Sequence, residues 1–224
     1  MKIDILTLFP EMLDGFLNTS IIKRAIDKKL IEVNLINFRN YSPLKNKQVD
    51  DTPYGGGAGM ILRCEPIFEC LDSIDKTDAY IILLSPEGTK YNQSVASRLS
   101  LKKHLIIICG HYEGFDERIK SQVDEVISIG DYILTGGEIP AMAITDSVIR
   151  LLPSVINKDS LKSESFSDNL LDYPTYTKPA VYRNLKVPEI LLSGNHKLID
   201  EYRKLQRVNK TKNIRPDLME DNND

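Results

Sequence analysis

The chain of 224 residues has only three cysteines, and no apolar run in it approaches the roughly 20 residues of a membrane-spanning helix. The cysteines, Cys64, Cys70 and Cys109, lack metal-site spacing, and three thiols cannot all pair within one chain. Residues 1–9 resemble a strand rather than a signal peptide. We therefore expect a protein of a reducing, cytoplasmic compartment that has no membrane association.

A strong excess of one charge is also missing. The net charge is −3, which argues against a protein that coats nucleic acid non-specifically. However, residues 178–216 carry ten Lys and Arg against three acids, while the tail, residues 217–224, carries four acids and no base. A basic C-terminal arm on an acidic body indicates local contact with a polyanion, although a solvated helix face would have the same composition.

Short apolar runs alternate with segments of helical periodicity along the first two thirds of the chain. We expect strands at 2–8, 33–38, 79–84, 104–109 and 126–129, and helices at 11–30, 66–71, 92–99, 115–123 and 141–152. The continuous apolar runs at 79–84 and 104–109 are typical of strands that are buried on both faces. The alternation predicts an α/β fold with a mainly parallel sheet.

Three loops that contain glycine follow three of these strands, at 85–88, 110–114 and 128–137. Ligands of open α/β sheets bind outside the carboxyl ends of the strands, so we expect the three loops to converge on one site. Tight packing is the alternative explanation for their glycines. His111 lies in the second loop without a Ser or Cys nucleophile motif beside it, which is typical of a surface histidine.

A long polar loop is expected at 39–60. It contains Asp50 and Asp51 and four glycines, but it matches neither a P-loop nor the dinucleotide fingerprint. A loop of this length is usually functional or disordered. It is either a flexible surface loop or an ordered one whose aspartates accept hydrogen bonds from a base or a basic partner.

The character of the sequence changes after Leu152, where a stretch rich in Ser, Lys and acids begins. Two helices are expected beyond it, at 188–193 and 197–209. We divide the chain into a ligand-binding domain at 1–153, a linker or lid at 154–170, a small basic helical domain at 171–216 and a disordered acidic tail at 217–224.

Seven sequence blocks occur in an order that is far more specific than any single glycine loop. They are Leu8–Met12; Val49–Asp51 with Pro53–Gly57 and Gly59–Met60; Leu84–Pro86; Gly110 with Tyr112–Gly114; Ser128–Ala141; Leu170–Pro174; and Leu191–His196. Together they resemble the bacterial tRNA (guanine-N1)-methyltransferases, and the match runs from residue 1 to about 216.

The resemblance implies an enzyme of the trefoil-knotted (SPOUT) class that uses S-adenosylmethionine. Its product would be N1-methylguanosine at position 37 of tRNA, next to the anticodon. The class implies a deep trefoil knot at the C-terminal edge of the sheet and a homodimer whose active sites are shared between the chains. The small C-terminal domain would grip tRNA. The resemblance also suggests a magnesium requirement, for which the sequence shows no ligand set.

The resemblance also assigns residues to each part of the site. Contacts to the cofactor would come from Leu84, Ser85, Pro86, Gly110, Tyr112, Glu113, Gly114, Ser128, Ile129, Gly130, Asp131, Tyr132, Ile133, Leu134, Gly136, Gly137 and Pro140. Contacts to the tRNA guanine would come from Asp50, Asp51, Tyr54, Gly55 and Gly59. The family's catalytic arginine falls on Arg150, and its general base falls on Glu164.

These two assignments fit the chemistry. Guanine N1 must lose a proton to become nucleophilic, and a carboxylate can accept it. Negative charge then grows on O6, where an arginine stabilises it. The family most often has Asp where this chain has Glu164, so Asp168 is an alternative base and a linker glutamate without a role is another interpretation. His111 stands where relatives often carry Arg.

Two other functions are weighed against this one. A ribose 2′-O-methyltransferase of the same class would not need the two aspartates of the 49–60 loop. A non-catalytic RNA-binding module would not need the intact cofactor loops.

Overall fold

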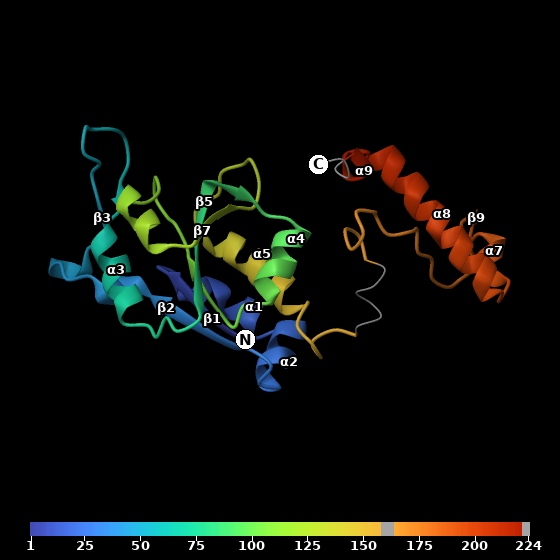
Figure 1. Cartoon of the computed structure of the whole chain (residues 1–224), viewed down its shortest axis with the longest axis horizontal. Coiled ribbons are helices and arrows are strands. Elements are labelled where there is room, and N and C mark those ends of the chain that lie inside the picture. The colour runs from blue at the N-terminus through green and yellow to red at the C-terminus, as the bar shows by residue number, and fades with distance from the viewer. Residues whose placement is uncertain (158–163, 221–224) are drawn as a thin grey trace. The chain divides into compact units, whose positions relative to one another are not determined.

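The computed structural model describes residues 1–157 and 164–220. The chain divides into two compact units, Met1–Ile156 and Asn157–Asp224, and each is described by itself. Figure 1 shows the strands of the first unit and the long helix of the second. None of the described helices is long and apolar enough to cross a membrane.

Five strands of the first unit form one sheet in the order β2-β1-β6-β5-β7. They are β1 (Lys2–Thr7), β2 (Glu32–Asn37), β5 (Ala79–Lys90), β6 (His104–Ile108) and β7 (Glu125–Ser128). Every neighbouring pair is parallel; Ile5 of β1, for example, lies opposite both Leu35 and Ile107. The predicted α/β fold with a mainly parallel sheet is confirmed.

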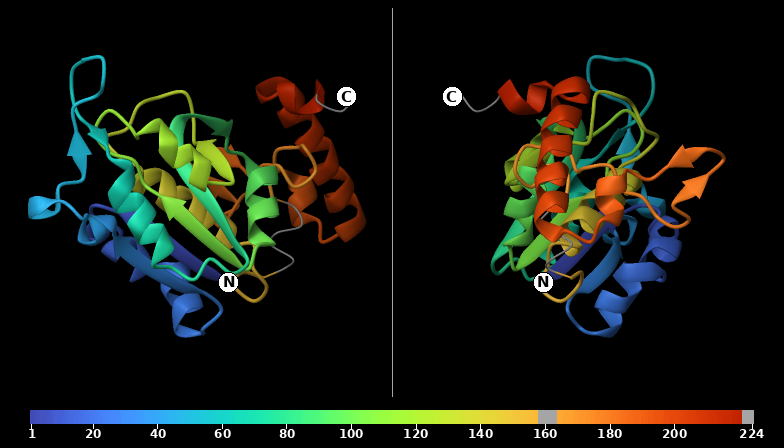
Figure 2. Two further views of the ribbon diagram at one scale, coloured as in Figure 1. Left: turned by 60° about the vertical axis from the view of Figure 1, so that its left-hand side comes forward. Right: turned by 90° about the vertical axis from the view of Figure 1, so that its right-hand side faces the viewer.

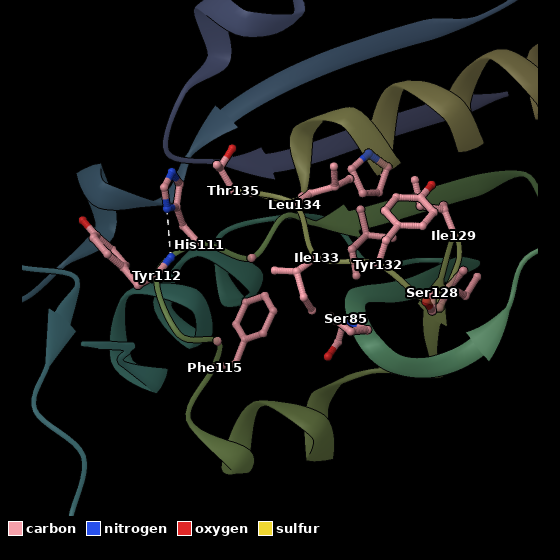
Figure 3. A pocket seen from close by; sticks show the side chains of 18 of the residues that line it. Ser85, His111, Tyr112, Phe115, Ser128, Ile129, Tyr132, Ile133, Leu134 and Thr135 are labelled. Carbon is pink, nitrogen blue, oxygen red and sulfur yellow. Dashed lines mark hydrogen bonds between the residues drawn. The ribbon is translucent and has the colours of Figure 1, made fainter. Parts of the chain in front are cut away.

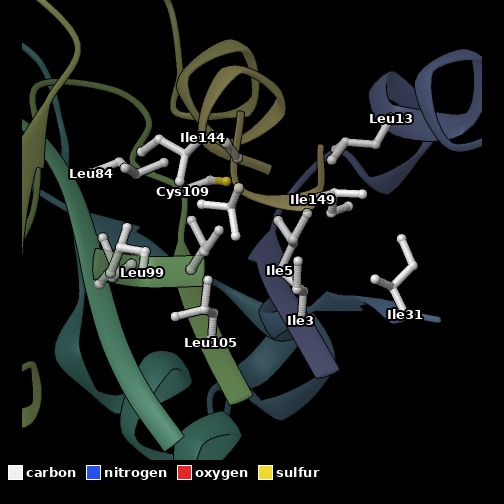
Figure 4. Packing of buried hydrophobic residues seen from close by; sticks show 14 of the residues in the cluster. Ile3, Ile5, Leu13, Ile31, Leu84, Leu99, Leu105, Cys109, Ile144 and Ile149 are labelled. Atoms are coloured by element: carbon white, nitrogen blue, oxygen red, sulfur yellow. The ribbon is translucent and has the colours of Figure 1, made fainter. Parts of the chain in front are cut away.

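One face of the sheet packs against three helices and against Leu13, which precedes the first of them. Ile3 and Ile5 of β1 lie on this face with Leu105 and Ile107 of β6, and α5 adds Ile144 (Figure 4). All five side chains are fully buried, as expected for a strand with cover on both sides. The helices on this face are α2 (Ser20–Asp27), α4 (Gln93–Ser100) and α5 (Glu138–Ile149).

The alternate residues of the same strands face the second layer. Leu6, Ile106 and Ile108 pack there in a separate buried cluster. The cover consists of α3 (Cys64–Asp72) and two 3-10 helices, η2 (Phe38–Tyr41) and η4 (Glu117–Gln122). The first unit therefore has three layers, with the sheet in the middle.

Two predicted helices were wrong. The segment 11–30 is not one helix but η1 (Pro10–Leu13), α1 (Asp14–Leu17) and α2. The break occurs because Thr19 is extended and its hydroxyl donates to Gly15 O, at 2.7 Å, instead of continuing the helix. The segment 115–123 forms the 3-10 helix η4 rather than an α-helix, and the side chain of Asp116 caps it by accepting from Arg118 N.

The polar segment 39–60 also has more structure than the sequence predicted. It holds the end of η2, the short 3-10 helix η3 (Lys45–Lys47) and strand β3 (Asp50–Asp51). β3 pairs antiparallel with β4 (Ile61–Leu62), so the glycine-rich stretch is the tip of a hairpin. The two aspartates therefore lie on a strand rather than in a loop.

The second unit contains a hairpin and one dominant helix (Figure 2). Its elements are β8 (Val181–Tyr182), β9 (Leu185–Lys186), α7 (Glu189–Leu192), α8 (His196–Ile214) and α9 (Asp217–Glu220). Helix α8 is longer than predicted, and Asn195 caps it by accepting from Leu198 N at 3.3 Å. The prediction of a disordered tail was wrong for 217–220, which form α9. Residues 221–224, and 158–163 of the predicted lid, lie outside the described residues.

The central strand gives a test of the core. Ile107 is fully buried between two parallel neighbours. Replacing it with alanine should lower the free energy of unfolding in urea by about 2–5 kcal/mol, because the cavity cannot collapse. Leu101→Ala is the control, since Leu101 is 84% exposed and its loss should change the value by no more than about 0.5 kcal/mol. Equal effects of the two substitutions would contradict the assigned core.

Candidate active site

A pocket of about 320 Å³ lies at the carboxyl ends of β6 and β7 and beside residues 84–86 within β5. The three glycine-containing segments predicted to converge, at 85–88, 110–114 and 128–137, line it together with the start of α5. Figure 3 shows His111 and Tyr112 on one side of the pocket and Ser128, Ile129 and Tyr132 on the other. The loops thus meet where ligands bind in parallel α/β sheets.

The predicted loop at 85–88 is an excursion within β5, not a turn at the end of the strand. Leu84 and Thr89 both lie opposite Ile127 of β7, so residues 85–88 bulge out before the strand resumes. A bulge of this kind redirects side chains at the edge of a site. It brings Ser85 and Pro86 to the wall of the pocket.

The loops after β6 and β7 are joined directly. Gly137 N donates to Gly110 O at 2.8 Å, and His111 pairs with Gly136 in an isolated antiparallel bridge. A Cβ on Gly137 would lie 2.7 Å from the backbone of Cys109 and Gly110, so only glycine permits this approach. Strand β7 is at the edge of the sheet, next to β5. The loop that follows β7 therefore passes beyond β5 to reach the end of β6.

A buried carboxylate fixes the end of the same loop. Glu138 is the first residue of α5 and is only 2% exposed. Its Oε1 accepts a hydrogen bond of 2.6 Å from the Thr7 hydroxyl, which itself accepts from Phe9 N. The helix N-terminus favours the negative charge. Burial, and secondarily the Glu138 charge, raise the pKa of the Cys109 thiol well above its usual range.

The β3–β4 hairpin is docked on the loop after β6. Glu113 N donates to Met60 O at 3.0 Å, and Leu62 N donates to Gly114 O at 2.8 Å. Gly59 has a φ of +83°, and a Cβ there would lie 2.3 Å from the Glu113 side chain. The residues predicted to contact guanine and those predicted to contact the cofactor therefore share one hydrogen-bonded framework.

The two aspartates of β3 differ in their surroundings. Asp51 Oδ2 is 2.5 Å from Arg63 Nη1, and its Oδ1 accepts from Thr52 N at 2.8 Å. The hydrogen bond between Arg63 and Glu65 raises the pKa of the Arg63 guanidinium. Successive residues of a strand point to opposite faces, so Asp50 faces away from this ion pair.

All the residues predicted to contact the cofactor line the pocket except Asp131. Asp131 is exposed and pairs with Lys90 at 2.7 Å. The pocket also contains four residues that sequence reasoning missed: His111, Phe115, Ile127 and Thr135.

His111, for which the sequence favoured a surface position, lines the pocket. The residue is half-buried, its Nδ1 accepts from Tyr112 N at 2.9 Å, and its ring lies 4.9 Å from that of Phe9. Its position between two residues predicted to bind the cofactor was the signal that could have identified it.

The two residues predicted to be catalytic belong to different units. Arg150 caps the C-terminus of α5 in the first unit and is half-buried. Glu164 belongs to the second unit, where its backbone oxygen accepts from the Ser167 hydroxyl at 2.8 Å. In the described residues, no three His, Cys, Asp or Glu side chains form a group that could hold a metal ion.

Comparison with known proteins identifies the family of the chain. The family model described as tRNA (guanine-1)-methyltransferase TrmD matches residues 1–221. The chain belongs to this family. A tRNA (guanine-N(1)-)-methyltransferase of Malacoplasma penetrans is 57% identical over 97% of this chain and 96% of its own length. The proteins of that name from Carboxydothermus hydrogenoformans and Staphylococcus epidermidis are 57% and 54% identical, each over 98% of this chain and over 87% and 91% of their own lengths.

The junction of the loops can be tested with two glycines. Gly137→Ala should displace the backbone of the pocket, at a cost of about 1–3 kcal/mol for overpacking. At about 2–4 °C per kcal/mol for a chain of this size, the thermal midpoint should fall by roughly 2–12 °C. Gly15→Ala is the control, because a Cβ there meets nothing within 4 Å and alanine favours the helix. A midpoint unchanged by Gly137→Ala would contradict the close contact.

Proposed function

We propose that the protein transfers a methyl group from S-adenosylmethionine to N1 of guanosine 37 in tRNA, next to the anticodon. One observation carries the proposal. The hairpin that holds Asp50 and Gly59 is hydrogen-bonded to the loop that lines the pocket, so a base held by the hairpin would be close to a cofactor in the pocket. The family membership supports the same activity.

The pocket fits the cofactor in size and in lining. Its volume of about 320 Å³ is within the range of small-molecule sites, about 300–1,000 Å³. Gly110, Gly136 and Gly137 line it without side chains, so a ligand can approach the backbone closely, while Leu134 and Pro140 provide apolar walls. When bound, S-adenosylmethionine would supply a methyl group on a positively charged sulfur, which makes that carbon electrophilic.

The remaining chemistry falls to the chain's own side chains. Asp50 would accept hydrogen bonds from the guanine edge and orient the base. Glu164 would take the proton from N1 as general base. Arg150 would stabilise the negative charge that grows on O6. No step is assigned to a magnesium ion, because the described residues contain no ligand set that fits one.

The architecture is part of the proposal. The passage of the loop after β7 beyond β5 to the end of β6 supports a deep trefoil knot around the pocket. Ile133 lines the pocket yet is 82% exposed, which supports a homodimer in which a second chain completes the site. We assign the ligand domain to 1–153, the lid to 154–170 and tRNA binding to the basic segment 171–216. Three buried free cysteines agree with a cytoplasmic location.

The catalytic assignments predict distinct losses. Glu164→Gln should reduce methyl transfer by about 10²–10⁴-fold, because the amide cannot accept the N1 proton. Arg150→Ala should reduce it by about 10²–10³-fold, through loss of charge stabilisation. The measurement is single-turnover transfer of labelled methyl to tRNA, with S-adenosylmethionine affinity measured by calorimetry.

Glu164→Asp is the matched control for the first substitution, since it keeps the carboxylate and should retain substantial activity. Affinity for S-adenosylmethionine should persist in all three variants. Normal turnover by Glu164→Gln or Arg150→Ala would refute the role of that residue.

A further inference from the structure

The segment that carries Glu164 has no regular secondary structure, yet it is fixed within the second unit. Its internal bonds form a compact loop: Phe166 N donates to Leu170 O at 2.8 Å, and Asp172 N donates to the Ser165 hydroxyl at 2.9 Å. The Ser167 hydroxyl donates to Glu164 O. Residues 164–172, termed here the base segment, are therefore a folded unit rather than an open chain.

Helix α8 holds the base segment through its backbone. Leu171 N donates to the Thr211 hydroxyl at 2.9 Å, and Arg207 Nε donates to Leu171 O at 3.2 Å. Lys210 Nζ donates to Asp172 O at 3.0 Å. Both polar backbone groups of Leu171 are thus satisfied by side chains one helical turn apart.

A charged pair adds to these bonds. Arg207 binds both carboxylate oxygens of Asp168, with Nη1 2.8 Å from Oδ2 and Nη2 bonded to Oδ1. A bidentate pair of this kind fixes geometry as well as charge. The side chain of Arg207 is only 12% exposed, while that of Asp168 is 52% exposed, so the pair lies at the surface with its guanidinium packed inward. Asp168, the alternative general base, is therefore occupied in anchoring.

Thr211 is the centre of the contact. It is fully buried, and its hydroxyl donates to Arg207 O at 2.8 Å while it accepts from Leu171 N. Removing the hydroxyl would leave the half-buried Leu171 amide without this acceptor, which costs more than losing a fully exposed bond. The hydrogen bond to the base segment explains why the polar side chain of Thr211 is buried at this position of α8.

We propose that Arg207 and Thr211 are positioning residues for the general base: helix α8 fixes the base segment and so sets where Glu164 can be presented to guanine N1. The inference rests on the proposed function of Glu164. Because α8 also carries exposed basic side chains such as Lys204, the same helix would bind the tRNA backbone and hold the base for its guanosine.

Amide hydrogen exchange of the full-length protein tests the anchor without reference to activity. Thr211→Val keeps the shape of the side chain but lacks the hydroxyl, and exchange of 164–172 should become about tenfold faster or more. Thr211→Ser restores the hydroxyl and should return exchange close to the original rate. Unchanged exchange in Thr211→Val would overturn the proposal.

Single-turnover methyl transfer tests the consequence. Thr211→Val and Arg207→Gln should both lower the rate by about tenfold or more, with S-adenosylmethionine affinity unchanged and Thr211→Ser active. Lys204→Gln is the charge-matched control: it should weaken tRNA binding without changing exchange of the base segment. If Thr211→Val does not fold, Arg207→Gln provides the same test of the rate.

The outcomes separate this inference from the proposed function. Faster exchange with an undiminished rate, while Glu164→Gln is inactive, would overturn the positioning role and leave the base assignment intact. Normal turnover by Glu164→Gln would remove both, since there would be no base to position.

Discussion

The close contact between the loops after β6 and β7 is the constraint on which the site depends. A backbone hydrogen bond from Gly137 N to Gly110 O joins them where no side chain would fit, next to the bridge between His111 and Gly136. The buried Glu138 then ties the start of α5 to the end of β1 through Thr7. The loop after β6, which accepts the Gly137 bond at Gly110, also receives the β3–β4 hairpin through the bonds of Glu113 and Gly114. Pocket and hairpin are therefore one framework rather than two adjacent loops.

The two units of the chain contribute different groups. The first unit contains the pocket, the hairpin and Arg150, all held by backbone bonds and a core that is buried on both faces of the sheet. The second unit contains Glu164, whose segment is bonded to side chains of α8 at Leu171. In the proposed function, the groups that bind the ligands and the general base belong to separate units, so the arrival of tRNA would be coupled to deprotonation.

The periodicity of the sequence was sufficient for the sheet and for the place of the pocket. Buried strands such as 104–109 are unambiguous, and the position of ligands at their carboxyl ends follows from parallel topology. Local hydrogen bonds, which periodicity does not reveal, set where some helices end and how some site residues are held. The Thr19 hydroxyl bonds to Gly15 O and ends a helix that the apolar pattern would continue. The partners of Asp51 and His111 are distant or backbone groups, so their surroundings were not visible in the pattern. The assignment of Glu164 and Arg150 came from the family resemblance, since neither residue has a distinctive spacing.

The most direct test of the account is the identity of the methylated atom. The protein would be incubated with labelled S-adenosylmethionine and two tRNA transcripts that differ only in having guanosine or adenosine at position 37. The account predicts incorporation into the guanosine transcript alone, recovered on nucleoside analysis as N1-methylguanosine. Methylation of a ribose hydroxyl, or no incorporation into either transcript by folded protein, would contradict it.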